Sequence, residues 1–184
     1  MKEKLKKLKQ FTTASFAIWP FDPRKTTKLL HCRIVIIGLN PAAVIKFGEN
    51  YHKVGHRFDK WYLEGFSRSP FLGSYMTDLI FCPEPKSGIV IRKWKEKDGK
   101  FMRDNIKSLE KQFKILGVKE TTSILCIGKN TEKLFLPTFP SFKHVFCIKH
   151  PNSYRMVNNK NVFLRDLKEI GKKIQKRGNR DSHD

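Results

Sequence analysis

At Arg33-Ile-Val-Ile-Ile-Gly-Leu-Asn40-Pro41, an apolar run with the composition of a buried strand ends at a polar amide. A second run of the same design, His144-Val-Phe-Cys-Ile-Lys-His150-Pro151, ends at an imidazole. In both, a proline follows the polar residue, fixes a turn and takes the chain out of the sheet. We expect the side chains of Asn40 and His150 to face one cleft, as two groups suited to catalysis.

Four apolar runs have strand character, and four stretches with helical spacing alternate with them. The strand-like runs are Ile34 to Leu39, Tyr75 to Phe81, Ser123 to Ile127 and His144 to Ile148. The helical stretches are Phe58 to Phe66, Phe101 to Leu116, Asn130 to Phe135 and Val162 to Ile174. This alternation predicts a three-layer αβα domain with a central, mostly parallel four-stranded sheet. Ligands of such sheets bind outside the carboxyl ends of the strands.

The length and composition predict a single domain. With 184 residues, of which 39% are hydrophobic, the chain can bury one good core, and no Pro/Gly/Ser-rich linker divides it. Residues 1–30 are expected to include a basic helix or arm that docks on the domain or faces DNA, and residues 172–184 a frayed basic tail. The apolar stretch from Phe16 to Trp19 is too short for a signal peptide or a membrane span.

The net charge indicates an anionic partner. Lys and Arg number 38 against 17 Asp and Glu, which gives a formal charge of +21. Because cationic side chains that contact phosphates supply most non-specific affinity, we expect nucleic acid as the partner. The alternative is a charge that serves only solubility. The four cysteines form no CxxC pair, so neither a zinc nor an iron–sulfur site is supported, and a reduced, cytoplasmic setting is expected.

Three short motifs in order carry a resemblance to a known family. They are Gly38-Leu39-Asn40-Pro41-Ala42, then Gly55-His56-Arg57-Phe58 with Trp61, then His150-Pro151-Asn152-Ser153. Together they resemble the uracil-DNA glycosylase superfamily, most closely its mismatch-specific (G:T/U) branch, from about Ile34 to Met156. Two positions depart from the family pattern, because Ala42 replaces the usual glycine and Asn152 lies inside the last motif.

The resemblance implies a monofunctional, monomeric DNA glycosylase that needs neither a metal nor a cofactor. Such an enzyme flips a uracil, or a related damaged or mismatched base, out of DNA and leaves an abasic site. Cleavage of the N-glycosidic bond needs a positioned water on one side and hydrogen-bond donors for the departing base on the other. The Asn40 side-chain carbonyl can orient the water, and His150 can donate to the base O2.

The resemblance also suggests residues that bind the flipped base. The rest of the first motif, Gly38, Leu39, Pro41 and Ala42, would lie against it. Tyr51, seven residues before Phe58, has the spacing of the family's stacking aromatic, with Phe47 as a second candidate. Asp78 could form another edge of the pocket. The alternatives are that either ring is a packing aromatic and that Asp78 is a structural cap.

A further set of residues is expected to contact DNA. Tyr154, Arg155 and Met156 follow the last motif where the superfamily inserts a wedge, although Arg155 could instead bind phosphate. Asn152 and Ser153 could donate to the DNA backbone or simply cap a turn. Lys129 belongs to Gly128-Lys129-Asn130, which opens a helix whose N-terminus suits phosphate but lacks P-loop spacing.

Two other functions remain open from the sequence. One is a catalytically silent, nucleic-acid-binding relative of the same fold, because an Asn-Pro after a strand is often only a turn and a histidine at a strand end is often only half-buried. The other is an RNA-associated basic protein, which would account for the charge but not for the paired motifs. In a bacterial cell, a DNA glycosylase would be cytoplasmic and associated with the nucleoid.

Overall fold

A computed structural model of the chain describes residues 2–11, 13–17, 23–41, 47–48, 59–68, 70–96, 99–151, 153 and 159–178. Within these residues the helices are α1 (Lys2–Leu8), α2 (Pro23–Leu29), α3 (Asp59–Phe66), α4 (Ser87–Trp94), α5 (Lys100–Leu116), α6 (Lys129–Thr138) and α7 (Lys160–Gly178). The strands are β1 (Ser15–Phe16), β2 (His31–Gly38), β3 (Ser74–Asp78), β4 (Ser123–Ile127) and β5 (Val145–Ile148).

The strands form one sheet in the order β1-β3-β2-β4-β5. Strands β3, β2, β4 and β5 run parallel, and β1 pairs antiparallel with β3. The mostly parallel sheet predicted from the sequence is therefore confirmed, but it has five strands rather than four. The extra strand, β1, is only two residues long, so it leaves no alternating pattern in the sequence.

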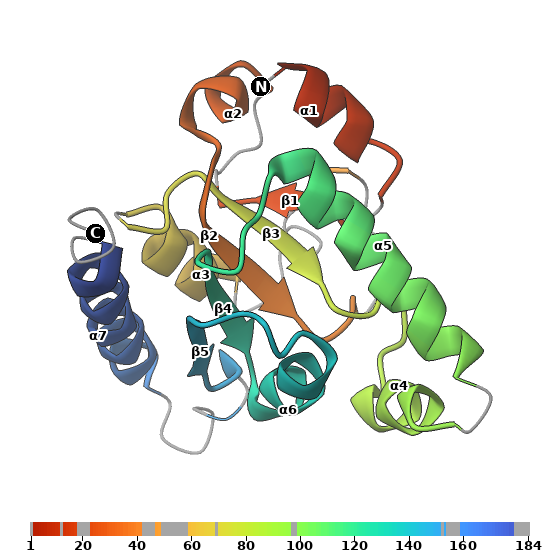
Figure 1. Cartoon of the computed structure of the whole chain (residues 1–184). Coiled ribbons are helices and arrows are strands. Elements are labelled where there is room, and N and C mark those ends of the chain that lie inside the picture. Colours follow the sequence, from red (N-terminus) through yellow and green to blue (C-terminus); the bar gives the residue numbers. More distant parts are fainter. Residues whose placement is uncertain are drawn as a thin grey trace.

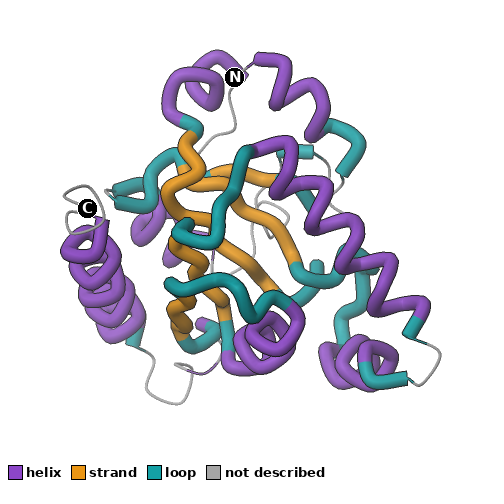
Figure 2. The backbone as a smooth tube through the Cα atoms, viewed as in Figure 1, coloured by secondary structure: helices purple, strands orange, loops and turns teal. Residues whose placement is uncertain are grey.

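Helices cover both faces of the sheet, as the three-layer prediction requires (Figures 1 and 2). One face packs against α1, α4, α5 and α6, and the other packs against α3 and α7. Side chains of β2 alternate between the two layers, with Val35 and Ile37 on the first face and Ile34 and Ile36 on the second. All four are at most 2% exposed. Burial on both sides explains why this strand reads as a continuous apolar run.

The first helix docks on the body of the domain. Leu5 and Leu8 of α1 are buried in the same core as α5. The Lys4 Nζ donates a hydrogen bond of 2.8 Å to the carbonyl of Leu116, the last residue of α5. A cation at this position satisfies a carbonyl that has no partner within the helix. It also interacts favourably with the partial negative charge at the C-terminal end of the helix dipole. At the other terminus, α7 stays helical from Lys160 to Gly178, so the expected basic tail begins inside a helix.

Gly73 sets the start of β3. Its φ is 85°, and an added Cβ would collide with the carbonyl oxygen of Leu29. We expect Gly73→Ala to lower the free energy of unfolding by roughly 2 kcal/mol or more, since strain and collision add. Urea denaturation would measure this. Gly88→Ala is the matched control, because a Cβ at this α4 position has no neighbour within 4 Å. Equal stabilities of the two variants would contradict the conclusion that the backbone at Gly73 requires glycine.

Candidate active site

A cavity of about 510 Å³ opens at the carboxyl edge of the sheet. Its walls come from the ends of β2, β3, β4 and β5 and from the first turns of α4 and α6, and they include both Asn40 and His150. Pockets for small ligands and cofactors commonly have volumes of about 300–1,000 Å³. The cavity is therefore large enough for a nucleobase.

The topology explains why two residues 110 positions apart in the chain line one cavity. β2 ends at Gly38 and β5 ends at Ile148, and both run parallel to β4, which lies between them. Parallel neighbours deliver their carboxyl ends to the same edge of a sheet. Asn40 lies two residues beyond the end of β2, and His150 lies two residues beyond the end of β5.

The Asn40 side chain is held in one orientation. Its Nδ2 donates to the carbonyl oxygens of Glu84 at 2.7 Å and Pro41 at 3.0 Å. Backbone carbonyls only accept hydrogen bonds, so these contacts fix which end of the amide is nitrogen. Within the described part of the chain, no hydrogen bond to the Asn40 Oδ1 is formed. This acceptor is thus left to orient a ligand or a water.

The loop after β3 is tied to the chain around Asn40. The amides of Leu79 and Ile80 donate to the carbonyls of Gly38 and Leu39, each at 2.9 Å, and the Glu84 amide donates to the Pro41 carbonyl at 2.9 Å. Glu84 was not predicted as a residue of the site. The signal for it in the sequence is the proline-rich stretch Cys82-Pro83-Glu84-Pro85, which directly follows the apolar run from Tyr75 to Phe81.

The end of β5 is tied to the start of α6. The Gly128 amide donates to the Ile148 carbonyl at 2.7 Å, and the Ser153 amide donates to the His150 carbonyl at 2.8 Å. Gly128 has a φ of 92°, and a Cβ built on it would lie 3.6 Å from the Cβ of His150. The His150 backbone is therefore positioned by the tight turn that begins α6.

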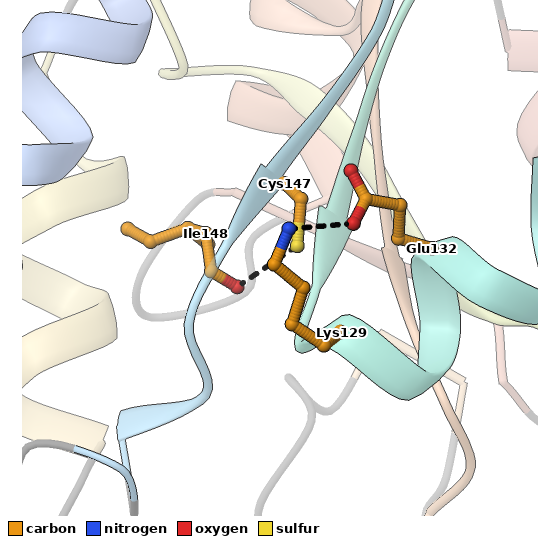
Figure 3. A network of polar contacts seen from close by, with 4 residues as sticks. All are labelled: Lys129, Glu132, Cys147 and Ile148. Atoms are coloured by element: carbon orange, nitrogen blue, oxygen red, sulfur yellow. Dashed lines mark hydrogen bonds and ion pairs between the residues drawn. The ribbon is translucent and has the colours of Figure 1, made fainter.

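Lys129 lines the cavity, but its ammonium group is engaged nearby (Figure 3). Its Nζ lies 2.9 Å from the Glu132 carboxylate, and this hydrogen bond raises the pKa of Lys129. Because the Lys129 side chain is 66% exposed, the pair adds little stability. Figure 3 also shows the neighbouring Cys147, whose pKa is raised to about 11 chiefly by burial, so it is a neutral thiol rather than a nucleophile.

Asp78 is the last residue of β3 and lies in the cavity wall, only 3% exposed. Burial raises the pKa of its carboxyl group well above the ordinary value. The wall also includes Tyr62 of α3, which is 2% exposed and whose ring stacks on Phe66 with centroids 5.6 Å apart. In the sequence, Tyr62 is only part of a helical apolar face, so its place in the cavity wall comes from the tertiary structure.

The remaining candidates lie in different places. Gly38, Leu39 and Ser153 line the cavity, whereas Pro41 is buried and does not line it. Phe47 is not in the cavity wall and packs edge-on against Phe16 in the core, with ring centroids 5.6 Å apart. Six candidates fall outside the described residues: Ala42, Tyr51, Asn152, Tyr154, Arg155 and Met156.

No helix in the described ranges is both long and apolar enough to cross a membrane. The same ranges contain no group of three or more His, Cys, Asp or Glu residues placed to hold a metal ion.

Comparison with known protein families identifies the superfamily of the chain. No curated protein matches the sequence. The family model described as the Uracil DNA glycosylase superfamily matches residues 25–172, which include every strand of the parallel part of the sheet and both cavity residues that end the apolar runs. The chain therefore belongs to the uracil-DNA glycosylase superfamily.

Proposed function

We propose that the protein is a DNA glycosylase that hydrolyses the N-glycosidic bond of uracil, or of a related damaged or mismatched base, and leaves an abasic site. The observation that carries this proposal is the shared cavity of Asn40 and His150 at the carboxyl edge of the sheet. Superfamily membership gives the reaction class, and the net charge of +21 suits a DNA substrate.

The Asn40 amide positions the attacking water in this mechanism. Its Nδ2 is held by two backbone carbonyls, so the Oδ1 accepts a hydrogen bond from a water placed against the sugar C1′. A neutral amide is too weak a base to remove a proton early. The glycosidic bond therefore breaks first, and water adds to a sugar that has already gained cationic character.

The departing base accumulates negative charge, and the cavity offers several groups to stabilise it. His150 donates a hydrogen bond to the base O2. The first turns of α4, at Ser87, and of α6, at Lys129 to Thr131, line the same cavity. Neither helix has a side-chain cap at its N-terminus, so backbone N–H groups and the positive ends of two helix dipoles face the developing anion.

We also propose that the enzyme is monofunctional and belongs to the mismatch-specific branch. A lyase reaction would need a deprotonated amine as nucleophile. Hydrogen bonding to Glu132 raises the pKa of Lys129 and keeps that amine protonated. The branch assignment rests on the first motif, where the residue that orients water is an amide, Asn40, instead of a carboxylate.

The proposed partner is DNA with its target nucleotide flipped into the cavity of a monomeric enzyme. Ser153, which lines the cavity, would contact the DNA backbone, and the residues that follow it would supply the wedge. These proposed contacts would run the DNA along the carboxyl edge of the sheet. The activity would be cytoplasmic, where the genome of a bacterial cell lies.

Base release from oligonucleotides tests the proposal directly. Single-stranded, U:A, G:U and G:T substrates would be incubated with the wild type and with Asn40→Ala and His150→Ala, and abasic sites revealed by alkaline cleavage. We expect the wild type to release at least one base and both variants to be strongly impaired. If no substrate loses a base, the protein is a silent relative. If structured RNA competes better than DNA at fixed salt, it is an RNA-associated protein.

Lys149 supplies a further testable contact. It is exposed in the cavity wall and forms no ion pair within the described part of the chain. Because each phosphate contact contributes about 0.9 to the slope of log K against log salt, Lys149→Ala should reduce that slope by about one. Lys28→Ala is the control, since Lys28 is exposed on α2, just before the amino end of β2. Fluorescence anisotropy would measure both slopes, and equal slopes would exclude a contact by Lys149.

A further inference from the structure

The carboxyl group of Asp78 has a buried oxygen atom without a partner in the cavity wall. The residue is 3% exposed, and its Oδ2 is buried with no hydrogen-bond partner among the residues that the structure describes. A buried polar atom without a partner usually costs stability, so its retention calls for an explanation. Asp78 pairs in register with Gly38 of β2, two residues before Asn40, and so it lies next to the strand end that delivers the amide.

Among the residues that the structure describes, no cation compensates this carboxyl group. Lys129 pairs instead with Glu132, and no ion pair with Asp78 is formed within the described ranges. The other ionisable groups around it are Tyr75 on its own strand, Tyr62 on α3, Glu84 in the following loop, and Lys149 and His150 after β5. Burial is the cause that raises the pKa of Asp78 and favours its neutral acid.

A neutral carboxylic acid has chemistry that a carboxylate lacks. It presents one O–H donor and one C=O acceptor side by side, whereas the ionised form presents acceptors only. Uracil offers the complementary pair through its N3–H and O4. A carboxylate could accept a hydrogen bond from N3–H, but it has no donor for O4, and its lone pairs would repel those of O4.

We propose that Asp78, as the neutral acid, reads the flipped base by donating one hydrogen bond to it and accepting another. The substrates are then bases that present an adjacent donor and acceptor, with uracil as the probe. This inference rests on the proposed function and assigns base recognition to Asp78, while Asn40 and His150 act at the sugar and at O2. Loss of the Asp78 proton ends the recognition.

Binding of an uncleavable substrate tests this role apart from catalysis. The probe is a single-stranded oligonucleotide with one 2′-fluoro-2′-deoxyuridine, whose fluorine disfavours the cationic sugar. The reference is the same strand with a tetrahydrofuran abasic analogue. The ratio of the two dissociation constants gives the preference for the base, and it would be measured from mildly acidic to mildly alkaline pH at constant ionic strength.

Two variants of similar size separate the alternatives. Asp78→Asn keeps a donor and an acceptor at every pH, and Asp78→Leu keeps neither. We expect the wild-type preference to fall by up to about tenfold per pH unit above the pKa of Asp78 in the folded protein. The Asp78→Asn preference should change only through ionisation of uracil itself. Asp78→Leu should show no preference at any pH.

Unfolding of the same proteins gives a readout that does not involve DNA. Because folding raises the pKa of Asp78, its contribution to stability is fully present below the pKa of the unfolded chain and is lost as the pH rises toward the folded value. The folding equilibrium constant of the wild type, relative to Asp78→Asn, should therefore fall by up to about tenfold per pH unit across that window.

Three results would overturn the proposal. They are a retained preference in Asp78→Leu, identical pH profiles for the wild type and Asp78→Asn, and the absence of any wild-type preference. Base release from the matching deoxyuridine strand, measured in parallel, shows whether the glycosylase function also fails. Release without a preference refutes only the role of Asp78, whereas no release from any substrate refutes the proposed function.

Discussion

Asn40→Ala should slow single-turnover base release by roughly 10²-fold or more, because it removes the acceptor that positions the attacking water. The amide is anchored through Nδ2 to the Glu84 and Pro41 carbonyls, so its Oδ1 occupies a fixed place in the cavity. Alanine leaves the water without that guide. The rate would be measured with enzyme in excess over a uracil-containing strand, so that product release does not limit it.

Asn130→Ala is the matched control for this substitution. Asn130 carries a second amide in the cavity wall, exposed in the first turn of α6, and the proposed mechanism uses only its backbone N–H, which alanine keeps, and gives its side chain no role. Its removal should change the rate by no more than a few-fold. The affinity of Asn40→Ala for an uncleavable strand should stay near that of the wild type. If Asn130→Ala lost as much activity as Asn40→Ala, the loss would reflect damage to the cavity rather than to water positioning.

His150→Ala should lower the same rate by about 10²- to 10³-fold, the typical cost of removing one donor that stabilises charge in a transition state. His150 lines the cavity two residues after β5, where hydrogen bonds from the Gly128 and Ser153 amides hold the backbone. Donation to the base O2 strengthens as the glycosidic bond breaks. The loss should therefore appear in the rate of cleavage more than in the affinity for DNA.

A conservative variant and a distant histidine control this result. His150→Gln keeps an N–H donor of similar reach and should recover part of the rate. His144→Ala removes a histidine from the opposite end of β5, where its Nδ1 lies 3.1 Å from an Arg177 guanidinium nitrogen, and should leave the rate unchanged. Equal activity of His150→Ala and the wild type would remove His150 from the mechanism and leave charge stabilisation to the helix N-termini.

The elements that the sequence predicted well are those with strong local patterns. The run from Ser123 to Ile127 is β4 without any change of bounds, and all five of its residues are buried. The stretch from Phe101 to Leu116 is α5 with one residue added at its start. Central strands and long amphipathic helices bury a defined set of their own residues, so their periodicity is written into a short window of sequence.

The elements that were missed depend on partners far away in the chain. β1 is a strand only because Ser15 and Phe16 pair with Met76 and Tyr75 of β3. α4 begins in a stretch of turn-forming residues and ends in a basic one, so it is not among the helices predicted from the sequence. Its Val90 and Trp94 find their place against the core beside α5. Neither segment has enough local signal to outweigh its turn and charge content.

The sequence by itself determined that two apolar strands end in an amide and an imidazole, and that an α/β domain would carry both to its ligand-binding edge. This was readable because strand character and the Asn-Pro and His-Pro turns are properties of consecutive residues. The tertiary structure alone decided that β4 separates the two strands, that the Glu84 carbonyl fixes the Asn40 amide, and that the Asp78 Oδ2 is buried with no hydrogen-bond partner in the described part of the chain. These features arise from strand order and from hydrogen bonds between distant segments, and no short window of sequence encodes either.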